Sequence, residues 1–188
     1  MASKIKVDAL ETADGTGTIA LSNQFTGMTT SSLPALGGAQ MPTGSVLQVV
    51  QVTGSTGSTT TSSTVAVVGD AGTITPSSTS SKILVTITGT VRFGSNNAGV
   101  LAIWRDVAGA GYSEVQSFSR HTVYQSHSTG NAEQGQFVSM SYLDSPNTTS
   151  ACNYKAAINS WTAGQTTYWL PNPSHQDQTT IIMMEIAG

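Results

Sequence analysis

The sequence predicts an all-β protein, an antiparallel β-sandwich of the jelly-roll type preceded by an extended N-terminal arm. Several segments alternate apolar and hydroxyl residues with the period of two that is typical of half-buried strands. Hydroxyl residues are abundant, with 25 Ser and 28 Thr among 188 residues, and β-branched Thr suits a pleated surface. No long segment keeps the apolar spacing of an amphipathic helix, so we expect almost no helix.

Residues 1–43 are predicted to form an arm and linker. Two short apolar stretches flank Asp14-Gly15, a dipeptide typical of a short hairpin. The residues that follow are rich in Gly, Ser, Thr and Pro and indicate a linker. The arm has too few large apolar residues to bury a core of its own, so we expect it to fold against sister chains or a docking protein, or else to remain disordered. The candidate residues for anchoring or arm assembly are Ile5, Val7, Leu10, Ile19 and Leu21.

Residues 44–188 are predicted to form the sandwich. The clearest strand is 82–93, in which Ile83, Val85 and Ile87 share one face and threonines occupy the other. Further strands are predicted at 45–52, 61–69, 98–106, 135–144, 152–161 and 179–187. The Ser-Asn-Asn cluster at 95–97 indicates a hairpin between 82–93 and 98–106. About eight strands with hydroxyl-rich turns favour a jelly roll.

The segment 179–187 is apolar on both faces. Such a strand is either central in a sheet or covered by a neighbouring subunit. The candidate subunit-interface residues are Ile181, Met183 and Glu185. Since Glu185 is a carboxylate within an apolar strand, we expect it to pair with Arg92, Arg105 or Lys155.

Composition argues against several classes of function. Charged residues make up 9% of the chain, against about 25% in an ordinary soluble domain. With seven Lys and Arg and a net charge of −3, no basic patch is expected to bind nucleic acid. No apolar run has the length of a membrane span, and the N-terminus lacks the pattern of a signal peptide. Because Cys152 is the single cysteine, stability must come from packing or oligomerisation.

No catalytic residue, cofactor site or metal site is predicted. His121 and His127 do not have a usual metal-ligand spacing, although a threefold axis could gather three copies of one histidine. The acidic residues are scattered, and no Gly-x-Ser-x-Gly nucleophile motif occurs. We therefore expect a protein that is not an enzyme.

A mixture of aromatic and hydrogen-bonding residues in loop-like segments indicates a surface for a neutral glycan. The candidate glycan contacts are Tyr124, His127, Tyr168, Trp169, Asn172, His175 and Asp177. For Tyr168 and Trp169, packing in the sandwich or at a subunit interface is an equally open alternative. Trp104 and Trp161 are expected instead to pack in the sandwich or at a subunit interface.

Several segments of the sequence resemble those of a known protein family. The head "SKIKVDALETADGTGTIAL" resembles that of tail-fibre-like proteins of tailed phages, including those of cyanobacteria and other marine bacteria. The phrases "MPTGSVLQVVQV", "ITPSSTSSKILVTITG", "SYLDSPNTTSACNYK" and "TIIMMEIAG" resemble the β domain of the same proteins. Residues 107–134 and 162–177 resemble it least.

The resemblance implies a virion structural protein, commonly a homotrimer, with an N-terminal anchor and a distal β domain. It would be made in the bacterial cytoplasm and lie on the outer surface of the particle, in contact with other virion proteins. The chain has no long repetitive shaft, so a short tail fibre or host-recognition fibre is favoured over a long one. A capsid decoration or cement protein and a head fibre remain open. A free-standing carbohydrate-binding module is the alternative from another class.

Overall fold

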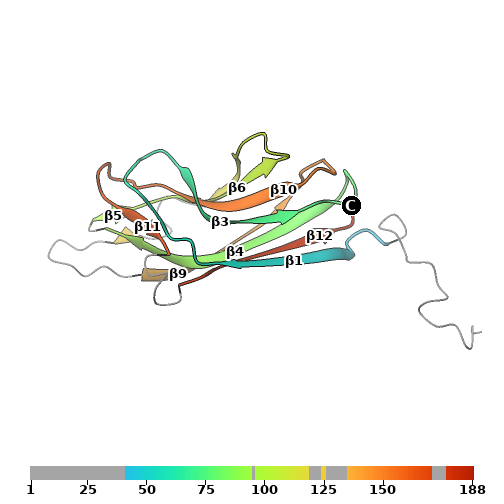
Figure 1. Ribbon diagram of the computed structural model, residues 1–188, viewed down its shortest axis with the longest axis horizontal. Helices are drawn as coiled ribbons and strands as arrows, with labels where there is room; N and C mark the ends of the chain where they lie inside the picture. Colours follow the sequence, from blue (N-terminus) through green and yellow to red (C-terminus); the bar gives the residue numbers. More distant parts are fainter. Residues whose placement is uncertain (1–40, 95, 119–123, 126–134, 171–176) are drawn as a thin grey trace, which may run out of the picture. The chain divides into compact units, whose positions relative to one another are not determined.

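The computed structural model describes residues 41–94, 96–118, 124–125, 135–170 and 177–188 (Figure 1). Within these ranges the chain is all-β and contains no helix, as predicted. Its strands are β1 (Val46–Gly54), β2 (Ser58–Thr60), β3 (Ala66–Ile74), β4 (Lys82–Phe93), β5 (Asn97–Ala98), β6 (Leu101–Val107), β7 (Ser113–Phe118), β8 (Tyr124–Gln125), β9 (Gly135–Asp144), β10 (Cys152–Ile158), β11 (Thr167–Trp169) and β12 (Thr179–Ile186). The predicted arm residues Ile5, Val7, Leu10, Ile19 and Leu21 lie outside the described residues.

Eight strands form two packed sheets with the strand order of a jelly roll. One sheet runs β1-β12-β4-β9, and the other runs β3-β10-β6-β7. Numbered along the chain, these eight strands are arranged 1-8-3-6 and 2-7-4-5, the interleaving that two Greek keys produce. All the pairings are antiparallel. The fold predicted from the sequence is therefore confirmed.

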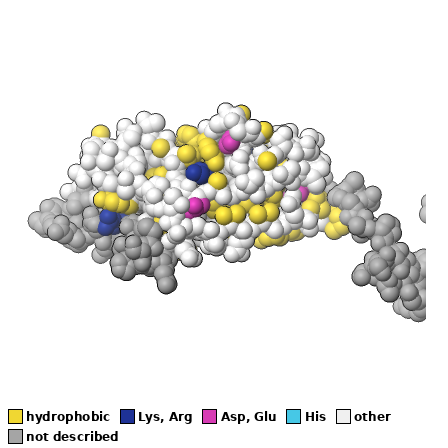
Figure 2. Space-filling view, viewed as in Figure 1, with side chains coloured by type: hydrophobic (Ala, Val, Ile, Leu, Met, Phe, Trp, Pro, Cys, Tyr) yellow, Lys and Arg dark blue, Asp and Glu magenta, His cyan; other side chains and the backbone are white. Residues whose placement is uncertain are grey.

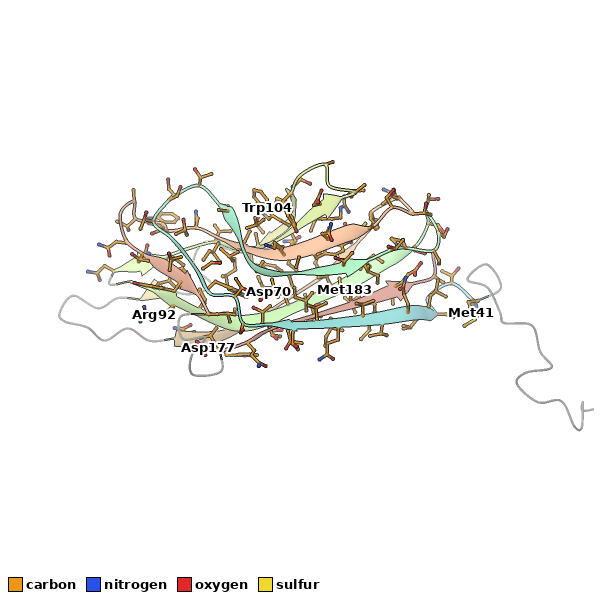
Figure 3. All side chains as sticks on the ribbon, in the orientation of Figure 1. Met41, Asp70, Arg92, Trp104, Asp177 and Met183 are labelled. Carbon is orange, nitrogen blue, oxygen red and sulfur yellow. The ribbon has the colours of Figure 1, made fainter. Side chains whose placement is uncertain are left out.

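The core lies between the two sheets. In β4 every second residue, from Ile83 to Phe93, is buried, and the residues between them are partly exposed. From the opposite sheet, Ile103 and Tyr154 meet this layer. Figure 3 shows Met183 of β12 between the sheets, where it is fully buried. The period-two alternation thus separates a dry inner face from a hydroxyl-rich outer face.

Two local predictions are wrong. The predicted hairpin between 82–93 and 98–106 does not form, because β4 and β6 belong to opposite sheets and the chain crosses over between them. The predicted strand 61–69 is displaced, since 61–65 is a connection and β3 begins at Ala66. The segment around this connection consists mostly of Ser and Thr, so it lacks the alternation of apolar and polar residues that would indicate where a strand begins.

The predicted interface residues on β12 lie in the core of a single chain. Ile181 and Met183 are 0% exposed and Glu185 is 1% exposed. β12 is a central strand, bonded to β1 on one side and β4 on the other. For this inward side of the segment the central-strand reading is correct, because these three side chains are covered within one chain.

The N-terminal connection enters beside the end of β12. The Gly44 amide donates to the Ala187 carbonyl and the Ala187 amide donates to the Ser45 carbonyl, both at 2.8 Å. Figure 3 places Met41 at one end of the sandwich and Arg92 toward the other. The loop 159–166 and β5 lie at the end away from Met41 (Figure 1). The domain therefore has one end at which the chain enters, near Met41, and a distal end.

Candidate functional site

Trp169, a predicted glycan contact, is a core residue. Its side chain is 0% exposed, and its indole Nε1 donates to Thr179 Oγ1 at 2.9 Å. β11 lies between β4 and β2, which turns Trp169 toward the core and Tyr168 away from it. The ring fits because glycines face it: a Cβ at Gly89 would lie 2.6 Å from Trp169 Cζ2. Of the two readings of Trp169, the glycan contact is wrong and core packing is correct.

The other predicted glycan contacts do not form a described cluster. Tyr168 is half-buried, and the Arg92 guanidinium lies 3.9 Å from its ring centroid, a cation–π contact on one ring face. Asp177 is half-buried just before β12. Asn172, His175 and His127 lie outside the described residues, and of Tyr124 only the backbone is described, in β8.

The exposed tryptophan at the distal end is Trp161, not Trp169. Its side chain is 48% exposed in the loop between β10 and β11. The expectation that Trp161 packs inside the sandwich is therefore wrong, and its packing at a subunit interface stays a prediction. Trp104 is half-buried on the outer side of the β3-β10-β6-β7 sheet, where it covers Ala102 and Ala157 (Figure 3).

The loop that carries Trp161 is held by a buried amide. Asn97 is 1% exposed. Its Nδ2 donates to Ser160 Oγ at 2.9 Å and to Thr167 Oγ1 at 3.2 Å, while its Oδ1 accepts from the Thr162 amide at 3.1 Å. The Trp161 amide itself donates to the Ala98 carbonyl at 2.8 Å. Fixed bonds on both sides of Trp161 limit the entropy lost on binding a ligand.

This distal loop, residues 159–166, has the chemistry of a carbohydrate contact. An indole offers a broad apolar face with little rotamer entropy to lose. Exposed Thr162 and Gln165 supply a hydroxyl and an amide beside it in sequence. Nothing in a single sequence marks which tryptophan is exposed, because the difference depends on the bonding of β11 to β4 and β2.

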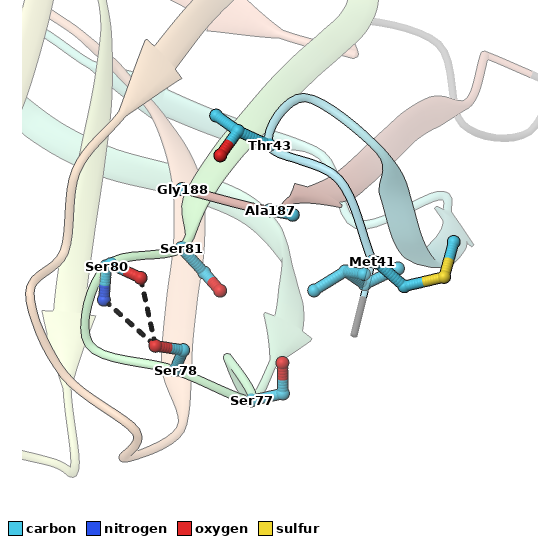
Figure 4. Close-up of a pocket in the computed structure, with 9 residues that line it drawn as sticks. Met41, Thr43, Ser77, Ser78, Ser80, Ser81, Ala187 and Gly188 are labelled. Carbon is cyan, nitrogen blue, oxygen red and sulfur yellow. Dashed lines mark hydrogen bonds between the residues drawn. The ribbon is translucent and has the colours of Figure 1, made fainter. Parts of the chain in front are cut away.

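At the end where the chain enters, four serines and the residues after Met41 line a cavity of about 450 Å³ (Figure 4). Its lining includes Met41, Leu47, Ser77 and Ser81. Ser77 and Ser81 also reach inward, to Glu185. The cavity is thus lined by apolar and hydroxyl groups. Its serines Ser77 and Ser81 are held in place by hydrogen bonds to the Glu185 carboxylate.

Glu185 is bonded by neutral donors and not by Arg92, Arg105 or Lys155, so the predicted ion pair is wrong. Its Oε1 accepts from the Ser77 amide, Ser77 Oγ and Ser81 Oγ, each at 2.7 Å, and its Oε2 accepts from Gln48 Nε2 at 2.6 Å. Burial pushes the pKa of this carboxyl up, but the bonds from Ser77, Ser81 and Gln48 outweigh burial and hold the pKa below its ordinary value.

The depressed pKa of Glu185 predicts acid sensitivity. Its stabilising contribution is present above the unfolded-state pKa of 4.5 and is lost as pH falls through the lower folded-state pKa. Glu185→Gln should cost about 1–3 kcal/mol at neutral pH, because the amide puts a donor where acceptors are needed. Urea unfolding should also show a smaller loss of stability in acid for the variant than for the wild type. Equal losses in the two proteins would contradict this role.

Within the described residues, no group of three His, Cys, Asp or Glu side chains is placed to hold a metal ion. In the same part of the chain, no helix is long and apolar enough to span a membrane.

No family model matches the chain, and no curated protein matches it. Among solved structures, the chain is similar to a chain in the structure of the infectious bursal disease virus Gx strain. The match has 10% identity and a TM-score of 0.40, and it covers 83% of this chain and 37% of the viral chain. It is also similar to the VP2 subviral particle of the same virus, at 13% identity and a TM-score of 0.37, again over 83% and 37%. The chain therefore spans little more than a third of these proteins. These likenesses assign no function to it.

Proposed function

We propose that this chain is a non-enzymatic structural protein of a tailed-phage virion, a homotrimer whose arm docks on the particle and whose jelly roll projects outward. The observation that carries the proposal is a jelly-roll strand order placed directly after a phage-fibre-like head. The phrases that resemble the family fall on framework strands, "VLQVVQV" on β1, "KILVTITG" on β4 and "TTIIMMEI" on β12. Jelly rolls recur in viral shells and in lectins, where rigid strands support variable loops.

Within the particle, we favour a short tail or host-recognition fibre. The distal loop carries an exposed indole at the end away from Met41, where an arm-anchored protein would meet a host surface (Figure 1). One ring binds a sugar weakly, but three copies on one trimer would bind a dense glycan layer together. A capsid decoration protein or head fibre would share the architecture and would not need Trp161 for adsorption. A free-standing carbohydrate-binding module would not need the arm.

Deleting residues 1–30 should separate anchoring from folding. We expect the truncated chain to keep the thermal midpoint of the β domain, because the described core uses residues after Met41. Incorporation into particles, measured by immunoblotting of purified virions, should fall to background. Incorporation at the wild-type level would show that the arm is not the anchor.

Immunogold labelling of intact particles tests the proposal as a whole. Label on the tail supports the fibre, and label on the head supports the decoration protein or head fibre. Unlabelled particles from cells that make the protein would refute a virion role.

A further inference from the structure

The outer face of the β1-β12-β4-β9 sheet carries an apolar patch that no described element covers. The register of the strands aligns Val49, Met184, Leu84 and Leu143 in one row across all four strands. Ile182 lies in the next row toward the distal end, and Val46 and Ile186 lie in the next row toward the arm. We call this set the apolar face: Val46, Val49, Leu84, Leu143, Ile182, Met184 and Ile186.

The apolar face is accessible to a partner. Val46 is 51% exposed, Val49 57% and Leu143 46%, and the members on the two central strands are half-buried. Figure 2 shows hydrophobic atoms along the lower side of the domain, where Figure 1 places β1. Seven contiguous apolar side chains on one sheet face are more than the scattered exposed residues of an ordinary surface.

Charge selects the kind of partner. The acidic residues of these strands, Glu185 and Asp144, point inward and are buried. Lys82 is the charged residue near the apolar face on these four strands. It lies opposite Ile186 in the register of β4 and β12, at the border of the patch. A copy of the same face can therefore approach without burying carboxylates or placing charges in the centre. An oppositely charged partner would find little to bind.

The edge strand β1 lacks the usual protection against strand or face pairing. Natural edges are commonly guarded by charges, prolines or coverage. The nine residues of β1, VLQVVQVTG, include no charged residue and no proline. Within the described part of the chain, β1 pairs only with β12. The strand is therefore suited to coverage by another chain.

The position of the chain entry points to other copies of this chain as the occupant. Residues 1–40 join the domain at Met41, and the Gly44–Ala187 bond lies next to the Val46–Ile186 pair of the apolar face. Copies brought together by their arms would hold their apolar faces close to one another at high effective concentration. We propose that the apolar face is the contact between copies of this chain. This deepens the proposed function, because apolar faces gathered around a threefold axis would hold the proposed homotrimer together.

Paired substitutions on the full-length chain test the contact by sedimentation velocity at micromolar concentration. Val49→Glu and Leu143→Glu place a charge in the apolar face at positions exposed enough to leave the fold intact. We expect each to weaken self-association roughly tenfold or more, because a charge would be buried unpaired in the contact. The matched controls are Thr53→Glu on β1 and Ser139→Glu on β9, on the same face but outside the patch. They should change self-association less than twofold, because they lie outside the proposed contact.

A wild-type monomer, or equal effects of patch and control variants, would overturn the inference. Thermal melts identify any variant that loses its fold, and the remaining patch variant then decides. If the arms alone hold the copies together, all four variants will sediment like the wild type, which also overturns it. Sedimentation does not involve the particle, so this inference can fail while immunogold labelling still supports the virion role.

Discussion

Trp169→Ala is expected to cost roughly 3–5 kcal/mol of unfolding free energy, as truncation of a fully buried aromatic ring typically does. The loss combines a large cavity against Gly69 and Gly89 with a hydrogen-bond partner, Thr179, left without its donor. A domain with a total stability of about 5–15 kcal/mol has little reserve against such a change. Urea unfolding of the full-length protein, followed by far-UV circular dichroism, measures it.

Trp161→Ala is the matched control, since it removes the same side chain at the exposed distal loop. We expect it to change the unfolding free energy by about 0.5 kcal/mol or less, the usual range for surface sites. In a recognition fibre it should weaken adsorption of particles to host cells while leaving incorporation intact. A stability loss equal to that of Trp169→Ala would show that the indole of Trp161 is needed for packing. Unchanged adsorption would favour the decoration protein.

Asp144→Ala is expected to cost about 3–5 kcal/mol of unfolding free energy, as much as Trp169→Ala. The reason is that it leaves a partly buried cation, Arg105, without its partner. Asp144 Oδ2 accepts from Arg105 Nη1 at 2.5 Å and from the Tyr154 hydroxyl at 2.6 Å. Burial alone would lower the pKa of Arg105, but the hydrogen bond and charge of Asp144 raise it above its ordinary value. The pKa of Tyr154 is raised by burial and by Asp144, so its hydroxyl stays a donor.

Asp106→Ala provides the comparison without a cation. Asp106 is also buried and accepts from the Gly111 amide at 2.8 Å, so its loss should cost about 1–3 kcal/mol. The double variant Arg105→Met, Asp144→Leu removes both charges and should recover much of the stability lost in Asp144→Ala. If Asp144→Ala and Asp106→Ala cost the same, the ion pair contributes no more than an ordinary buried hydrogen bond.

The long alternating segments were predictable from the sequence. The limits of β4 and β9 agree with the predicted 82–93 and 135–144, because a strict period of two over 12 and 10 residues leaves one arrangement that buries the apolar face. The short strands could not be predicted in this way. β7, SEVQSF, has few apolar residues, and β11 has three residues whose strand conformation depends on the bonds to β4 and β2.

The roles of the two distal tryptophans were not predictable, because they depend on residues far away in the sequence. Trp169 is buried since Gly69 and Gly89, on different sheets, leave room for its ring. Trp161 is exposed since Asn97 fixes its loop at the end of the sandwich. Likewise, the sequence of β12 shows that both faces are apolar, but only its register with β4 shows that the Ile181 side is the core and the Ile182 side is outside.

The central place of β12 has a consequence for how the protein is made. β1 and β4 bind the two sides of β12 and do not bind each other, although both precede it by many residues in the chain. During synthesis, these two strands must wait with unpaired backbone groups until β12 has emerged. The growing chain is then open to capture by a β12 from a neighbouring chain, an exchange of strands between nascent copies. Crowded synthesis would therefore favour strand-swapped products, and dilute synthesis would favour the correctly closed domain.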